Sequence, residues 1–170
     1  YVSIHALKTY KTQTSPIAVI SPGEPFHIKE AGKDWLINWY MVREKGVTLF
    51  GPPPEAVIDP VSKDEYIASV KAYLAVWRAG SIADWMHTRP SQAYAILTVC
   101  RGLYTVLYGE QPSKIRAAAW AEKELPEWAS LIRNAIVWRR DWRESDVDHE
   151  VTLPETRQFV RFVIDRIGGM

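Results

Sequence analysis

The chain has 170 residues, of which 47% are hydrophobic, and its 21 lysines and arginines nearly balance 20 aspartates and glutamates. A chain of this length can bury one substantial core, and a net charge of +1 provides no overall field that would attract nucleic acid or an anionic membrane. The single cysteine excludes an internal disulfide, and no apolar run approaches the roughly 18 residues of a membrane span. We therefore expect a cytoplasmic protein without nucleic-acid or membrane partners, whose oligomeric state the sequence leaves open.

The first 33 residues are predicted to be extended or irregular. Residues 2–7 alternate enough to form a short strand, and residues 8–22 contain the threonines, serines and prolines of a loop. The segment EPFHI, at 24–28, can add a short extended stretch. We assign residues 1–33 to a strand and linker that precede a helical domain, and residues 34–170 to that domain.

The helical pattern begins at Asp34 and ends at Gly46, where a brief buried run over residues 47–50 leads into prolines that keep the backbone extended. A second helix begins at Ser62, which forms a predicted capping box with Glu65. The segment SIADWMHTR that follows is less regular, so we expect a loop or a brief helix there.

Three further helices are indicated by capping residues and apolar spacing. The first extends from Pro90 to Gly109, and the next begins after Ser113, a predicted N-cap, and continues to Pro126. A helix of similar length follows Pro126.

The last helix is predicted to begin with a capping box of Thr152 and Glu155. Together these elements predict a mainly α fold, a helical bundle of five or six helices with a short N-terminal β segment.

Two cations of the central helices are candidates for an anion site. Arg101 lies within one predicted helix, and Lys114 opens the next one after a short turn. Because a helix N-terminus favours anions, the two side chains can converge on one phosphate. The alternative is that both are solvated or paired surface charges.

The same residues carry a family resemblance. The segment LTVCRGLYTVLYGEQPSKIRAAAWAEKELP resembles the C-terminal helical domain of aminoglycoside nucleotidyltransferases, the streptomycin and spectinomycin adenylyltransferase type of antibiotic-resistance enzyme. The segment DWLINWYMVREKGVTLFGPPPEAVIDPVS is similar to the linking region of that family. The resemblance implies that this domain closes over the nucleotide and the antibiotic, that Arg101 and Lys114 bind ATP phosphates, and that AMP passes from ATP to an acceptor hydroxyl.

The catalytic groups of that family belong to an N-terminal domain with a Gly-Ser motif and aspartates that bind Mg²⁺. Neither motif occurs at the start of this sequence, and the position that the family gives to a catalytic glutamate is Tyr1 or lies before it. We therefore assign no catalytic residue, expect the Mg²⁺ ligands on that other domain, and expect the chain to be incomplete for catalysis alone.

The resemblance also implies an acceptor site of aromatic and acidic side chains near the domain boundary. The candidates are Glu24, Asp84 and Trp85, since cationic aminoglycosides favour carboxylates and ring faces. The chain has Ser91-Gln92 where the antibiotic-binding helix of the family commonly begins with an acidic residue.

Two alternatives from other classes stay open. Arg143 and His149 match the loose arginine–histidine spacing of small helical ribonucleases of the toxin type, although the segment between them is acidic. The chain can also be a helical binding module without catalysis. The four histidines lack metal-site spacing, so we predict no metal site.

Overall fold

The structure is a computed structural model that describes residues 1–78, 85–140 and 148–170. It is mainly helical with one two-stranded sheet, as the sequence predicts. The chain divides into two compact units, Tyr1–Ser69 and Val70–Met170, which we describe one at a time. The domain boundary that we predicted after residue 33 divides the chain by family domain, whereas these units divide it by compactness. That boundary therefore stays a prediction.

The N-terminal unit contains an antiparallel pair of strands, β1 (Ser15–Val19) and β2 (His27–Ala31). The predicted strand at 2–7 is wrong, because Ser3 caps a helix there, α1 (Ile4–Thr9), by accepting a hydrogen bond from the backbone N–H of Ala6. The prediction of a loop over 8–22 is also wrong, since β1 lies within it.

Three helical segments follow the strands in this unit: the 3₁₀ turn Lys33–Trp35, α2 (Leu36–Lys45) and α3 (Pro54–Val57). The next helix is α4 (Lys63–Val76). The core consists of four buried side chains from these segments and the end of α1, namely Tyr10, Leu36, Trp39 and Ile58.

The predicted capping box at the start of α4 is confirmed. The Ser62 hydroxyl accepts from the Glu65 N–H at 3.1 Å, and the Glu65 carboxylate accepts from the Ser62 N–H at 2.8 Å. The predicted buried run at 47–50 is wrong, since Leu49 and Phe50 are 94% and 98% exposed. Apolar composition alone does not bury a segment that has no neighbouring element to cover it.

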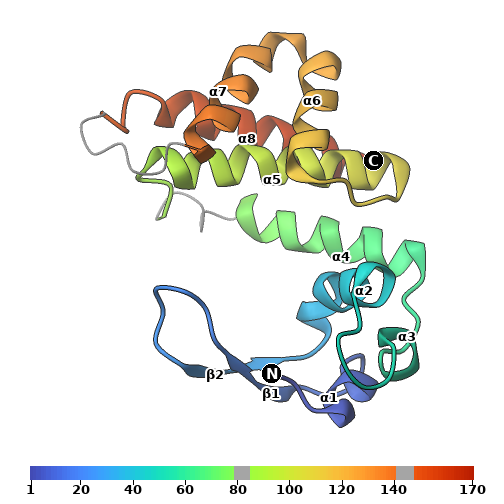
Figure 1. The fold of residues 1–170 in the computed structure, drawn as a ribbon. Helices are drawn as coiled ribbons and strands as arrows, with labels where there is room; N and C mark the ends of the chain where they lie inside the picture. The colour runs from blue at the N-terminus through green and yellow to red at the C-terminus, as the bar shows by residue number, and fades with distance from the viewer. Residues whose placement is uncertain (79–84, 141–147) are drawn as a thin grey trace. The chain divides into compact units, whose positions relative to one another are not determined.

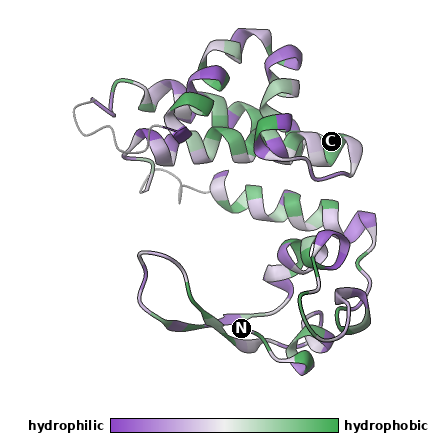
Figure 2. Cartoon of the chain, in the orientation of Figure 1, coloured by the Kyte–Doolittle hydropathy of each residue, from purple (hydrophilic) through white to green (hydrophobic). Residues whose placement is uncertain are grey.

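The C-terminal unit is organised around α5 (Arg89–Tyr108), which contacts α6 (Lys114–Glu124), α7 (Ala129–Arg140) and α8 (Leu153–Gly168). A 3₁₀ turn, Pro126–Trp128, joins α6 to α7. Hydrophobic residues occur along much of α5, as Figure 2 shows. Its fully buried side chains include Ala93, Ile96, Leu97, Val99, Cys100 and Leu103. Among the described residues no helix is both long enough and apolar enough to cross a membrane.

Local signals set the ends of α5 and the start of α6, as predicted. Gly109 follows α5 with a φ of 65°, a left-handed conformation that glycine adopts without steric cost, and its N–H donates to the carbonyl of Thr105. Ser113 accepts a hydrogen bond from the backbone N–H of Arg116 at 3.1 Å and so caps α6.

The start of α8 differs from the prediction. Thr152 precedes the helix but makes no capping hydrogen bond, because its hydroxyl donates to the side-chain carbonyl of Gln92 at 2.7 Å. The same oxygen of Gln92 accepts from Thr156, and the amide nitrogen donates to the carbonyl of His149. The buried side-chain amide of Gln92 needs hydrogen-bond partners, because a buried polar group without a partner costs free energy. The Thr152 hydroxyl serves as one of these partners and does not cap α8.

Leu74 packs closely against α5 at Gly102, and this contact supplies a test of the packing. A methyl group at this position would lie 2.4 Å from Cδ1 of Leu74, which is itself buried. We expect Gly102→Ala to lower the free energy of unfolding by about 1–3 kcal/mol through overpacking, in spite of the better helix propensity of alanine. Urea denaturation followed by circular dichroism measures this difference.

Gly168→Ala is the matched control, because nothing lies within 4 Å of a methyl group at that position. Equal stabilities of the two variants would show that Leu74 moves aside without cost.

Candidate functional site

The two cations that the sequence selects lie on adjoining helices of the C-terminal unit. Arg101 lies in the middle of α5, and Lys114 is the first residue of α6. The ammonium group of Lys114 lies 3.5 Å from the ring centroid of Tyr94, which is a close cation–π contact. Tyr94 and Arg101 are seven residues apart on α5, about two helical turns, so they share one face of that helix.

Burial and the positive charges of two arginines affect the ionisation of Lys114. The pKa of Lys114 falls from 10.5 to about 7, first because burial disfavours the charged ammonium and then because the Arg101 and Arg139 guanidinium groups repel it. Arg139 lies in the last turn of α7. Arg101 and Arg139 therefore both act electrostatically on Lys114, and the sequence analysis did not select Arg139. We call Arg101, Lys114 and Arg139 the cationic cluster.

None of the three cations forms an ion pair with a described residue, although other cations of the same helices do. Arg133 of α7 pairs with Glu122, and Arg116 of α6 lies 4.0 Å from the Glu110 carboxylate. Neighbouring like charges without a counter-charge are unfavourable, and a bound anion relieves that cost. The cluster is therefore suited chemically to binding an anion.

An aromatic cluster adjoins the cations. The ring of Tyr94 lies 5.8 Å from that of Trp85, and Trp77 lies 5.5 Å from Trp85 and 5.3 Å from Tyr73, measured between centroids. Burial raises the pKa of Tyr73, and the nearby Tyr94 raises it further. Tyr94 and Trp85 are 46% and 37% exposed, so flat ring surface is accessible beside the cations.

Comparison with known proteins assigns this arrangement to a family. Residues 56–166, which include α4 to most of α8, match the family described as "Aminoglycoside adenylyltransferase, C-terminal domain". The chain belongs to this family. The resemblance on which the sequence analysis rests is thereby confirmed.

Curated members of the aminoglycoside adenylyltransferases align with most of the chain. An aminoglycoside (3'') (9) adenylyltransferase of Rhizobium radiobacter is 29% identical over 126 residues, which cover 71% of this chain and 43% of that protein. The corresponding protein of Klebsiella pneumoniae is 29% identical over 131 residues, covering 75% and 47%. One from Escherichia coli is 32% identical over 84 residues, covering 49% and 30%. The chain therefore spans less than half the length of these adenylyltransferases.

The three residues predicted to bind the acceptor do not form one group in the described structure. Trp85 joins the aromatic cluster beside the cations. Glu24 is exposed in the turn between β1 and β2 of the N-terminal unit, where its N–H donates to the carbonyl of Ser21. Asp84 lies outside the described residues. Their role in binding an aminoglycoside stays a prediction.

The residues present suit a phosphate chain better than a metal ion. The cationic cluster, whose members have no ion-pair partner within residues 1–78, 85–140 and 148–170, is complementary in charge to phosphate oxygens. Within residues 1–78, 85–140 and 148–170 no three histidine, cysteine or acidic side chains gather as metal ligands. Cys100 is fully buried, and burial raises the pKa of its thiol to about 12, so it is a core side chain, as the sequence predicts.

His149, the residue behind the ribonuclease alternative, has structural hydrogen bonds. Its Nδ1 accepts from the backbone N–H of Arg89 at 3.0 Å, and its carbonyl accepts from Gln92 at 2.7 Å. Arg143 lies outside the described residues. The geometry of His149 thus gives it a role in joining the start of α8 to α5.

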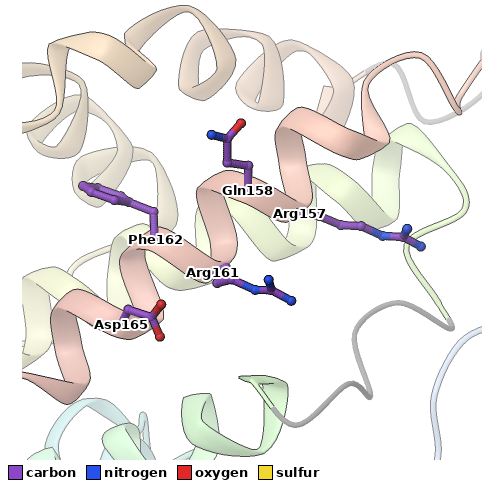
Figure 3. A pocket seen from close by; sticks show the side chains of 5 residues that line it. All are labelled: Arg157, Gln158, Arg161, Phe162 and Asp165. Atoms are coloured by element: carbon purple, nitrogen blue, oxygen red, sulfur yellow. The ribbon is translucent and has the colours of Figure 1, made fainter.

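A concave surface of about 510 Å³ lies along α8 and is lined by Arg157, Gln158, Arg161, Phe162 and Asp165. Figure 3 shows the guanidinium groups of Arg157 and Arg161 extending in the same direction from the helix. Asp165 is neutralised by Arg78, with 2.9 Å between Nε and Oδ1. None of the residues that the sequence selects lies among these five.

The lowered pKa of Lys114 predicts a specific pH dependence of stability. Because the unfolded chain holds the proton up to pH 10.5 and the folded chain only to about 7, folding expels a proton between these values. This group therefore makes the free energy of unfolding rise as pH increases across that window. We expect Lys114→Met to be more stable than wild type below pH ~7 and to lose that advantage by pH ~10, as measured by urea denaturation.

Lys123→Met serves as the control, since Lys123 is exposed in the last turn of the same helix. The same pH profile in both variants would contradict the assignment to Lys114.

Proposed function

We propose that the chain is the helical part of an aminoglycoside adenylyltransferase and that its cationic cluster binds the triphosphate of ATP. One observation carries this proposal: the Lys114 ammonium lies over the ring of Tyr94, on the face of α5 that also carries Arg101, and neither cation has an acidic partner among the described residues. Family membership supplies the reaction class, because the curated relatives are named as adenylyltransferases of aminoglycosides.

The chemistry explains why cations are needed there. In adenylyl transfer an acceptor hydroxyl attacks the α-phosphorus of ATP, the acceptor proton goes to a base, and pyrophosphate leaves with the electrons of the broken P–O bond. Negative charge grows on that leaving group, so fixed guanidinium and ammonium groups stabilise the transition state. We propose that ligands on a separate catalytic domain hold Mg²⁺, as the family resemblance implies, and that the ion would supply further neutralisation of the phosphate charge.

The aromatic cluster is the proposed acceptor surface. Aminoglycosides carry several ammonium groups, which are attracted to ring faces and to carboxylates. The partly exposed rings of Trp85 and Tyr94 provide the faces. Glu24 and Asp84 remain the proposed carboxylates.

Calorimetric titration with ATP and Mg²⁺ tests the phosphate assignment. We expect Arg101→Ala and Lys114→Ala to weaken nucleotide binding roughly tenfold to a hundredfold, because a charge-assisted hydrogen bond contributes about 1.5–3 kcal/mol. Lys123→Ala, on the same helix as Lys114 but exposed in its last turn, should bind like wild type.

Absence of heat at nucleotide concentrations of about 1 mM would contradict the proposal, since even weak specific sites saturate there. Binding of an unrelated protein partner with no nucleotide dependence would support the non-catalytic module. RNA cleavage that His149→Ala abolishes without unfolding would support the ribonuclease.

A further inference from the structure

The concave surface along α8 is lined by charged side chains that the proposed function does not use. Arg157 and Arg161 lie about one helical turn apart, and in Figure 3 their guanidinium groups extend in the same direction. We propose that this surface is a docking site for a partner protein and that it binds an acidic helical segment of that partner. None of its lining residues belongs to the cationic cluster, so this site is additional to the proposed nucleotide site.

The packing of α8 leaves this surface open to solvent. Phe159, Val163 and Ile167 are buried on the opposite side of the helix, and α8 packs against α5. Because successive helix residues point about 100° apart, Arg161 and Asp165 point away from that buried side. All the residues that line the surface are exposed. The packing of the helix therefore gives no reason for the choice of these side chains.

Positive charge predominates on this surface. Arg78 pairs with Asp165, with 2.9 Å between Nε and Oδ1, so this carboxylate is already neutralised. Arg161 forms no ion pair within residues 1–78, 85–140 and 148–170. Among its described residues the surface, together with Arg78, has three guanidinium groups and one carboxylate. An anionic partner would balance this excess.

The spacing of the arginines favours a helical partner. Side chains four residues apart on a helix have Cβ atoms about 5–6 Å apart, so Arg157 and Arg161 match two carboxylates that are also four residues apart on another helix. A guanidinium group can bind a carboxylate through two parallel hydrogen bonds. Phe162 is 37% exposed, and its ring lies 5.8 Å from that of Trp128. This ring supplies apolar surface for an aliphatic side chain of the partner.

Nucleic acid fits this surface less well than an acidic protein segment does. A phosphate backbone is bound by cations that neutralise several phosphates. Here Arg157 and Arg161 are followed one turn later by the Asp165 carboxylate, and Glu155 lies in the first turn of the same helix. A short acidic helix needs only the two arginines.

Fluorescence polarisation with a labelled peptide tests this proposal on the full chain. The probe is a fluorescein-labelled, alanine-based helical peptide with two glutamates four residues apart and a leucine next to one of them. The control peptide has glutamines in place of the glutamates. We expect wild type to bind the glutamate peptide about tenfold more tightly, because hydrogen bonds between ionised groups are stronger than those between neutral groups.

Variants with opposite expected effects separate recognition from folding. Arg161→Gln should weaken binding of the glutamate peptide about tenfold, since it removes one charge-assisted contact. Asp165→Asn should tighten binding about threefold, because it removes a negative charge and releases Arg78 from its ion pair. Arg166→Gln is the matched control and should bind like wild type, since Arg166 is exposed in the last turn of α8 but does not line the surface.

Several results would overturn the proposal. Equal affinities for the two peptides, or no binding of the glutamate peptide at protein concentrations of about 1 mM, would show that the surface does not recognise carboxylates. Equal losses in Arg161→Gln and Arg166→Gln would indicate nonspecific attraction to a basic helix. Displacement of the peptide by inorganic phosphate or by single-stranded RNA at lower concentrations than by unlabelled peptide would identify a different ligand. Failure to bind ATP would contradict the proposed function alone, because the peptide assay contains no nucleotide.

Discussion

The burial of α5 is the constraint on which the C-terminal unit depends. A helix that is hydrophobic on most sides is stable only when neighbours cover it, and α6, α7 and α8 do so. Once α5 is enclosed, its one polar face is fixed relative to the beginning of α6 and the end of α7. The positions of Arg101, Tyr94 and Lys114 are therefore a product of apolar packing, and the close contact of Gly102 with Leu74 shows how little room that packing leaves.

The cationic cluster lowers the stability of the fold. Destabilising charges of this kind are often found at functional sites. Burial and two guanidinium groups disfavour the charge on Lys114, whereas cations nearby on the same helices have acidic partners. A fold selected only for stability would pair or remove such charges. The nucleotide binding that we propose would give a reason to keep them, because a phosphate chain is bound best by cations that no neighbouring carboxylate already neutralises.

Much of the helical fold was predictable, because helix ends carry local signals. Ser62 with Glu65, Ser113 and Gly109 act on backbone groups within a few residues, and all three were identified correctly. Thr152 failed because Gln92, sixty residues away in sequence, competes for its hydroxyl. The same limit applies to the site: Arg101 and Lys114 lie on helices adjacent in sequence, whereas the effect of Arg139 on Lys114 depends on the tertiary packing of α7.

The hydrogen bonds of Gln92 have a consequence for biosynthesis. Its side-chain amide is buried in α5, and the hydrogen bonds that it forms with described residues are to His149, Thr152 and Thr156. Until the ribosome has added these residues, the amide lacks these partners and α5 lacks the final helix that covers it. The C-terminal unit can thus reach its native state only after translation has delivered α8, and a nascent chain stalled before that point would present its apolar centre to chaperones.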